Sequence, residues 1–266
     1  MSNSDKAQEA LEQLQAEVEK LVTGEDWLRA LEIQARFHKY SFANTMLIWI
    51  QCPGATYVGG MKTIWNKMGR YIRKGERAIN ILAPILINDK EHEGEKLLIG
   101  FKTVGVFDLS QTEGEPFDIS ILTPEELDGD ADTILYTRVE SLATARGYTV
   151  ERGPMLGATM MGYTQPETKR IVIKKDASPL QALKTLVHEV AHILLHVDKD
   201  EFDYHSCRGQ AEVEAESVAF VVCKVFGLPT NDYSFAYVGS WSSGNIDEVR
   251  KAGERVAKTA KTILAE

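Results

Sequence analysis

The chain has 266 residues, enough for one large domain or for two of ordinary size. With 44% hydrophobic and 26% charged residues, its composition is typical of a globular protein with a substantial core. The longest apolar runs are too short to span a bilayer, and the acidic N-terminus does not resemble a signal peptide. A net charge of −9 argues against a general nucleic-acid coat protein, and the three scattered cysteines suit a reducing cytoplasm.

Helical spacing and turn signals predict the elements of the first half. Apolar residues recur every three or four positions over residues 4–22, which predicts an amphipathic helix that ends near Gly24. Further helices are predicted at 25–37, 41–51 and near 61–69. The β-rich sequences at 78–87 and 97–107 flank a charged loop and predict a hairpin. Because Pro84 lacks an N–H, the first of these strands is expected at a sheet edge or a bulge.

An acidic stretch separates the two halves of the chain. Residues 111–132 contain eight Asp or Glu residues and no Lys or Arg, together with two glycines and two prolines. This composition is typical of a linker and predicts a domain boundary near residue 125. The expected domains are therefore residues 1–125 and 126–266.

The second half predicts helices around two short strands. Helices are expected at 131–146, from Ser178-Pro179 onward, along 208–227 and at 246–264. Strands are expected near 159–163 and 170–173. The second strand directly precedes the helix that begins at Pro179, and its free edge could pair with an extended peptide.

A sequence of five residues, His188-Glu189-Val190-Ala191-His192, lies within an apolar helical run. Two histidines four residues apart share one helix face, so both rings can reach the same metal ion. Glu189 sits beside them, close enough to act as the base on a water bound to that ion. This HExxH pattern is the zinc-metallopeptidase signature, although it also occurs by chance. It predicts one Zn²⁺ ion, for which Mn²⁺ or Co²⁺ could substitute.

Glu212 is the predicted third ligand. It lies on the next predicted helix, and two antiparallel helices would bring it against the histidine pair. Glu216 lies one turn further on, where it could accept a hydrogen bond from the other ring nitrogen of one ligand histidine. The alternative is a helix whose glutamates face solvent.

Three other residues could contribute a donor atom to the same site. His196 continues the four-residue spacing, but a straight helix turns about 100° per residue, so His196 drifts off the shared face. His205 and Cys207 lie just before the helix of Glu212, and Cys207 could act as an inhibitory thiolate ligand. The simpler interpretation of these two is a loop histidine and an ordinary free thiol.

Residues 57–78 are locally basic, in contrast to the acidic average. Aromatic residues (Tyr57, Trp65 and Tyr71) are interleaved with the basic ones, which only Glu76 opposes. Cations pair with phosphates and aromatic rings stack on bases, so this pattern predicts contacts with single-stranded DNA. The predicted contact residues are Lys62, Trp65, Lys67, Arg70, Arg73, Lys74 and Arg77. The alternative is a solvated basic helix with Trp65 in the core.

Several of these segments resemble one known family. Residues 40–84 and 106–116 look like the N-terminal domain of ArdC-type antirestriction proteins. The sequences at 188–196, 210–228 and 237–241 are similar to the C-terminal domain of the same family. That family joins a domain that binds single-stranded DNA to a zincin-like metallopeptidase domain related to the ImmA/IrrE group. The resemblance covers about residues 25–265.

The resemblance implies an α+β fold, with a helical N-terminal domain that carries a small antiparallel sheet and a zincin-like C-terminal domain. It assigns the metal to His188, His192 and Glu212, the catalytic acid/base role to Glu189, and an acidic outer position to Glu216. The implied function is a cytoplasmic zinc metallopeptidase coupled to single-stranded DNA, acting in antirestriction or in protection of incoming mobile DNA. Its partners would be that DNA and an unidentified protein substrate, with no membrane.

Two other functions stay open. One is an antirestriction protein that binds DNA without proteolysis and uses the metal for its structure. The other is an ImmA-like peptidase that cleaves a repressor.

Two positions depart from the family pattern. ImmA/IrrE relatives usually carry Asn or Asp where Glu216 stands, although ArdC-like chains accept Glu. Relatives often have a histidine shortly before the aromatic residue of the segment at 237–241, where this chain has Ser234. If that histidine stabilises developing negative charge in relatives, Tyr237 or His205 would have to replace it here.

Overall fold

The computed structural model describes residues 3–88, 92, 95–117, 132–155, 157, 160–197 and 208–265. The chain divides into two units, and the division does not follow the linear order of the sequence. Unit 1 comprises residues 1–21 and 40–121, and unit 2 comprises residues 22–39 and 122–266. Residues 22–39, expected in the N-terminal domain, therefore pack with the C-terminal half. The predicted boundary near residue 125 lies outside the described residues.

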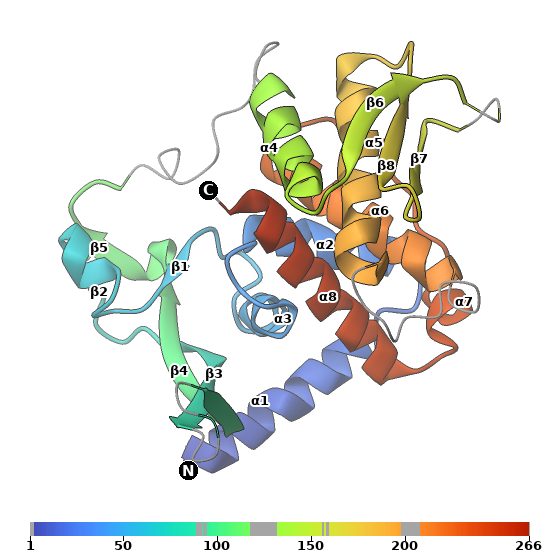
Figure 1. The fold of residues 1–266 in the computed structure, drawn as a ribbon. Coiled ribbons are helices and arrows are strands. Elements are labelled where there is room, and N and C mark those ends of the chain that lie inside the picture. The colour runs from blue at the N-terminus through green and yellow to red at the C-terminus, as the bar shows by residue number, and fades with distance from the viewer. Residues whose placement is uncertain are drawn as a thin grey trace. The chain divides into compact units, whose positions relative to one another are not determined.

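Unit 1 combines helices with a three-stranded antiparallel sheet of order β1-β4-β3 (Figure 1). Its helical elements are α1 (Asn3–Val18), α3 (Phe42–Gln51) and the 3-10 turns η1 (Trp65–Met68) and η2 (Leu109–Gln111). The sheet consists of β1 (Val58–Gly59), β4 (Lys96–Asp108) and β3 (Ile79–Asn88). A separate ribbon pairs β2 (Arg70–Ile72) with β5 (Thr112–Gly114).

The predicted hairpin is confirmed. Strands β3 and β4 pair antiparallel along the whole of β3, and β3 lies at the sheet edge, as Pro84 indicated. The register shifts between Ile85 and Leu86, where β4 contributes one extra residue, Ile99. The helix predicted near 61–69 was wrong in extent, because only the turn η1 forms. Gly69 has a φ of 68°, a left-handed conformation that ends the turn.

Asp108 is the fully buried residue that ties the end of β4 to the loop before β1. Its Oδ1 accepts hydrogen bonds from the backbone N–H groups of Thr56 at 2.7 Å and Tyr57 at 3.0 Å. Its Oδ2 accepts from the N–H of Ser110 at 2.8 Å, which caps η2. One carboxylate thus satisfies three backbone donors that would otherwise lose their partners in the interior.

Unit 2 is mainly helical and carries a second three-stranded sheet (Figure 1). Its helices are α2 (Gly24–Arg36), α4 (Asp132–Thr144), α5 (Pro179–His192), α6 (Arg208–Val225), α7 (Val238–Ser242) and α8 (Ile246–Leu264). A π-helical turn, η4 (Ile193–Val197), extends α5. The strands are β6 (Thr149–Gly153), β7 (Gly162–Gln165) and β8 (Arg170–Lys174).

Strand β8 is the centre of this sheet, which corrects the expectation of a free edge at the strand before α5. It pairs parallel with β6 and antiparallel with β7, so the edge strand next to it in the order β6-β8-β7 is β7. The sequence analysis missed β6, whose residues are mostly exposed and show no clear alternation. It also placed β7 a few residues too early.

Helix α5 begins and packs as its sequence indicates. Ser178 caps it by accepting a hydrogen bond from the N–H of Gln181 at 3.2 Å, and Pro179 occupies the first turn. The apolar face of α5 is buried, and the helix contacts α4, α6 and β8. The core of unit 2 therefore holds the HExxH segment on a fixed helix.

Trp27 explains why residues 22–39 belong to unit 2. Its side chain is fully buried, and its Nε1 donates to Ser217 Oγ of α6 at 2.9 Å. The ring also meets Trp241 of α7 edge-on, with the centroids 5.2 Å apart. Thr23 and Asp26 form a capping box that starts α2 just before this contact. Among the described residues, no helix has the length and apolar character needed to cross a membrane.

Replacing Asp108 with Ala should destabilise the protein by about 3 kcal/mol, because three N–H groups would lose a charged acceptor. Urea denaturation followed by tryptophan fluorescence measures this loss. The matched control is Asp176→Ala, since Asp176 is mostly exposed and lies 4.0 Å from Lys174. That control should change stability by less than about 0.5 kcal/mol. Equal effects of the two variants would contradict the role of Asp108.

Candidate metal centre

Helices α5 and α6 pack against each other (Figure 1). This packing brings three metal-donor side chains together. His188 and His192 project from α5, and their Nε2 atoms lie 3.0 Å apart. Glu212 projects from α6, and its Oε2 lies 3.5 Å from each of these nitrogens. The sequence predicted this set of three residues, and the structure brings all of them together.

The donor spacing fits a single metal ion. A tetrahedral zinc ion holds nitrogen and oxygen ligands at about 2.0–2.2 Å, which places its ligand atoms about 3.4 Å apart. The two contacts of Glu212, at 3.5 Å, match that separation. Within the part of the chain that the structure describes, no other group of three His, Cys, Asp or Glu side chains converges in this way.

Glu216 contacts the ring nitrogen of His188 that does not face Glu212. Its Oε2 is 2.9 Å from Nδ1 of His188. A proton on Nδ1 that points to this carboxylate leaves the lone pair of Nε2 free to bind a cation. This is the arrangement that the sequence analysis expected for Glu216.

The electrostatics of the centre favour positive charge. Burial alone would lower the pKa of His188, but hydrogen bonds with Glu212 and Glu216 outweigh burial and raise the pKa to about 10. The same contact with His188, together with that of His192, lowers the pKa of Glu212 well below its usual range. Without a metal, a proton on the ring supplies the positive charge that these carboxylates stabilise.

Glu189 is buried beside the donors and has its own hydrogen-bond partner. Its Oε2 accepts from Oγ1 of Thr164 at 2.8 Å. Thr164 belongs to the edge strand β7, so this contact links the strand edge to Glu189. Sequence reasoning missed Thr164, because nothing in the local pattern connects a threonine on one strand with a glutamate on a later helix.

The other candidate donors lie outside the cluster of three. His196 follows His192 in the π-helical turn, and its Nε2 lies 3.8 Å from Oε2 of the fully buried Glu214. Arg255 of α8 binds that carboxylate through Nε and Nη2. His205 and Cys207 fall outside the described residues. Tyr237 precedes α7 and is 59% exposed.

Lys184, one turn before His188, anchors the segment between α6 and α7. Its buried side chain donates to both oxygens of Asp232, at 2.7 and 3.0 Å. Tyr233 follows in that segment and lies under the Lys184 ammonium, 5.1 Å from the ring centroid. The sequence analysis did not find this clamp, whose two charges are far apart in the chain.

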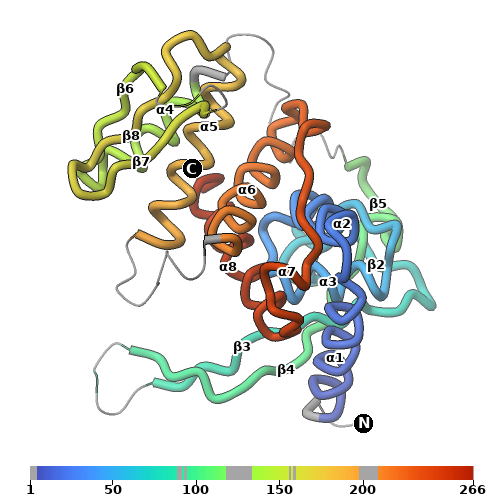
Figure 2. The backbone as a smooth tube through the Cα atoms, turned by 90° about the vertical axis from the view of Figure 1, so that its right-hand side faces the viewer, coloured from blue at the N-terminus to red at the C-terminus, as the bar shows by residue number. Residues whose placement is uncertain are grey.

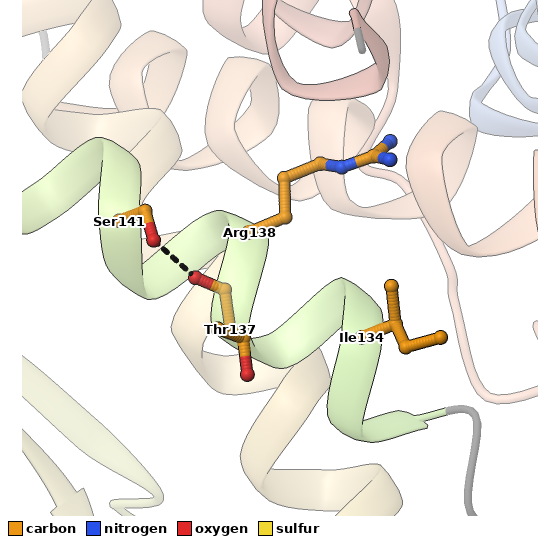
Figure 3. Close-up of a pocket in the computed structure, with 4 residues that line it drawn as sticks. All are labelled: Ile134, Thr137, Arg138 and Ser141. Carbon is orange, nitrogen blue, oxygen red and sulfur yellow. Dashed lines mark hydrogen bonds between the residues drawn. The ribbon is translucent and has the colours of Figure 1, made fainter.

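A shallow hollow over α4 is a separate feature of unit 2 (Figure 3). It is lined by Ile134, Thr137, Arg138 and Ser141, and the Ser141 hydroxyl donates to the Thr137 carbonyl at 2.7 Å. No metal-donor side chain lines it. It therefore adds nothing to the chemistry of the centre.

The basic segment of unit 1 needs one correction. Trp65 is fully buried, and its Nε1 donates to the Phe107 carbonyl at 3.0 Å. Its ring packs edge-on against Tyr57 and Phe117, with centroids 5.5 and 6.0 Å away. The prediction that Trp65 stacks on DNA bases was therefore wrong, because neighbours from two other segments enclose the ring.

Two of the six predicted cations are held within the protein. Arg70 binds the hydroxyl and carbonyl of Thr112 and the carbonyl of Glu115. Arg73 binds Glu76 and the carbonyl of Ser110. These contacts fasten β2 to the segment around β5.

The remaining cations are accessible. Four side chains are exposed and form no hydrogen bond or ion pair with the described residues: Lys62, Lys67, Lys74 and Arg77. Tyr71 of β2 is 62% exposed and is the accessible aromatic ring of this segment. The accessible part of the predicted DNA-contact segment is therefore these four cations with Tyr71.

Comparisons with known proteins divide the chain along its linear order, and place residues 22–39 with the N-terminal match although they pack in unit 2. Residues 4–113 match the N-terminal domain of anti-restriction factor ArdC, and residues 146–238 match the IrrE N-terminal-like domain of peptidases. The chain therefore carries a segment that matches the ArdC N-terminal domain, followed by one that matches the IrrE-like domain.

One curated protein is similar to this chain over most of the chain's length. The uncharacterized protein pXO2-81 of Bacillus anthracis is 25% identical over 281 residues, which cover 90% of this chain and 47% of that protein. The chain thus spans about half the length of the curated relative it matches.

Two solved structures of the antirestriction protein ArdC from the R388 plasmid share the fold. The metal-free structure has a TM-score of 0.53 at 22% identity, and the Mn(II)-bound structure has 0.54 at 21%. Each match covers 84% of this chain and 83% of the other. The expected α+β fold class is confirmed.

In the metal-free protein, stability should fall as pH rises from about 6.5 to about 10. The folded-state pKa of His188 lies above its ordinary value of 6.5, so the folded protein binds this proton more tightly than the unfolded chain. The resulting stabilisation is complete below the unfolded pKa and is lost as pH rises through the folded pKa. Urea midpoints measured across this range in the presence of a chelator test the expectation.

Glu216→Gln removes one of the two carboxylates that hold this proton and should flatten the dependence. Glu167→Gln, at an exposed turn position, is the matched control and should leave it unchanged. The same pH dependence in wild type and Glu216→Gln would show that Glu216 does not hold the proton.

Proposed function

We propose that this chain is a metal-dependent peptidase coupled to a domain that binds single-stranded DNA, and that it serves antirestriction of incoming mobile DNA. The observation that carries the peptidase part is the convergence of His188, His192 and Glu212 with Glu189 beside them. The match of residues 4–113 to the ArdC N-terminal domain supports the antirestriction part.

His188, His192 and Glu212 are the residues that would hold the ion, which we propose to be Zn²⁺, with Mn²⁺ or Co²⁺ as substitutes. When bound, the ion supplies Lewis-acid activation of a peptide carbonyl and of water. Glu216 fixes the ring of His188 through Nδ1, so that Nε2 keeps its lone pair toward the other donors.

Glu189 is the general base in this proposal. It takes a proton from the attacking water and passes it to the leaving amine of the scissile peptide. Thr164 holds one carboxylate oxygen of Glu189, which leaves the other oxygen for the reacting water. The edge of β7 that carries Thr164 is where we propose that an extended substrate pairs with the sheet.

Two observations weigh against the other functions. A metal used only for structure needs no buried carboxylate next to its ligands, yet Glu189 is buried there and held by Thr164. A repressor peptidase needs no basic surface on unit 1, yet that segment carries four exposed cations and an exposed tyrosine. Both features favour a working peptidase with DNA contact.

Glu189→Gln should keep the metal and the fold but abolish proteolysis, because an amide cannot accept the proton from water. The measurement is a proteome-wide search for new protein termini in cells that express wild type or Glu189→Gln. We expect termini that appear only with wild type. An equal set of new termini in both cultures would rule out Glu189 as the base.

His192→Ala is the comparison variant for this experiment. It should lose both the bound metal, measured by elemental analysis of the purified protein, and the new termini. Stoichiometric zinc in His192→Ala would contradict the ligand set. A variant that loses the metal but keeps the cleavage would contradict metal-dependent chemistry while leaving the ligand set intact.

Combined replacement of Lys62, Lys67, Lys74 and Arg77 with Ala should weaken binding of single-stranded DNA. Each lost phosphate contact should also reduce the slope of log affinity against log salt by about 0.7. Tyr71→Ala should weaken binding by about 1–3 kcal/mol through loss of base stacking, with little change in that slope. Fluorescence anisotropy of a labelled oligonucleotide at several salt concentrations measures both effects.

The control for this measurement carries Lys175→Ala and Lys258→Ala, two exposed cations of unit 2. It should bind like wild type. An unchanged affinity of the fourfold variant, or equal affinity of wild type for single and double strands, would remove the basic segment from the proposal.

A further inference from the structure

Helix α3 covers the inner half of the free edge of β3 with two side-chain amides. Asn44 donates to the Leu82 carbonyl at 2.9 Å and accepts from the Leu82 N–H at 2.8 Å. Gln51 makes the same pair of bonds with Asn80, both at 2.9 Å. Each amide takes the place of a peptide group in a neighbouring strand. The backbone N–H and C=O groups of the even-numbered residues of β3 therefore point away from β4, in the direction where a further strand would pair.

This cover ends at Pro84. Proline has no N–H to donate at an edge. Beyond it, the residues whose backbone groups point away from β4 are Leu86 and Asn88. Among the described residues, no hydrogen bond reaches the outward backbone groups of these two residues. The outer half of the β3 edge is therefore open to another strand.

The same part of the hairpin is apolar on both faces. Six large side chains there are each between 45% and 59% exposed: Leu86, Ile87, Leu97, Leu98, Ile99 and Phe101. Over the two faces together they offer on the order of 600 Å² of apolar surface, compared with the roughly 800 Å² that each partner buries in a standard interface. Figure 2 shows this end of the β3–β4 hairpin extending away from α3.

We propose that the outer half of the hairpin, residues 84–88 and 96–101, is a surface through which two copies of this chain associate. The β3 edges of the two copies pair antiparallel about a two-fold axis at Leu86. Leu86 of one copy then exchanges two backbone hydrogen bonds with Leu86 of the other copy. The N–H of Asn88 reaches the carbonyl of Pro84 in the other copy, while the Asn88 carbonyl gains no backbone donor there, because proline has no N–H.

The chemistry of the edge favours a second copy as the occupant. Residues 84–88 contain no charged side chain, so antiparallel pairing of this segment with itself opposes no like charges. Antiparallel pairing of β4 with itself about Ile99, the centre of its apolar run, would instead set Lys96 against Lys102 of the other copy. Asn44 already binds the backbone N–H and C=O of Leu82. The pairing therefore cannot extend inward past Pro84, which limits its register. The side chains of Leu86 and Leu98 gain apolar neighbours across the new strand pair.

The test measures the mass of the full chain by light scattering over a hundredfold range of concentration. We expect a dimer whose fraction rises with concentration. Leu86→Pro removes an outward N–H that the hairpin itself does not use, and Leu86→Lys places two cations at the axis. Each should raise the dissociation constant at least tenfold. Ile134→Lys, a change at a 67% exposed residue of α4, should leave the constant unchanged.

A cross-link tests the register even if Leu86→Pro disturbs the hairpin. Opposed residues of a hydrogen-bonded pair have Cα atoms about 5.5 Å apart, within the range that a disulfide spans. Under oxidation Leu86→Cys should therefore form a disulfide between two copies at position 86. Ile87→Cys should not, because the register sets Ile87 opposite Ile85.

Four results would overturn the proposal. They are a monomer at every concentration, a dimer that survives both Leu86 variants, equal cross-linking at positions 86 and 87, and a monomer that sediments with phosphatidylglycerol vesicles through the same side chains. The last result would assign the hairpin to a membrane surface.

Discussion

The packing of α5 against α6 is the constraint on which the rest of unit 2 depends, because it sets the distance between two histidines on one helix and a glutamate on the other. The i, i+4 spacing can align His188 and His192, but a third donor can come only from a second helix held at a fixed distance and rotation. If one helix moved by about 1 Å relative to the other, Glu212 would no longer lie at the same distance from the imidazoles.

Several contacts around the two helices hold this arrangement. Trp27 braces α6 at Ser217, next to Glu216, and Lys184 anchors Asp232 to α5 one turn before His188. Arg255 ties the buried Glu214 of α6 to α8. Charged and polar groups thus surround the centre in satisfied pairs, which is the support that a site with a strict geometry needs.

The spacing of residues along the sequence was sufficient to predict those features of the fold that depend on local interactions. The histidine pair follows from helix periodicity, the start of α5 from Ser178 and Pro179, and the hairpin from two β-rich runs around a charged loop. Glu212 required a further assumption, that two consecutive helices lie side by side, and the fold satisfied it.

Long-range contacts could not be predicted in the same way. Thr164 meets Glu189 only because β7 pairs with β8 beside α5, and no residue near Thr164 signals that pairing. Trp65 has the same neighbours in sequence as an exposed stacking ring would have. Its burial depends on Tyr57 and on Phe117, which lies far along the chain. Strand β6 is short and mostly polar on its surface, and its central neighbour β8 is parallel to it, so neither alternation nor a turn indicates it.

The early placement of α2 has a consequence for the dissection of this protein. Residues 22–39 complete the helical core of unit 2, and the chain then makes most of unit 1 before it returns to unit 2. A fragment that starts after the acidic linker would leave the Ser217 face of α6 without Trp27, and the hydroxyl and the surrounding apolar surface would meet water. The peptidase-like half is therefore not one continuous segment, and a fragment made by cutting the chain once cannot contain all of it without most of unit 1. Its helical core is complete only when α2, which precedes most of unit 1 in the sequence, is kept with it.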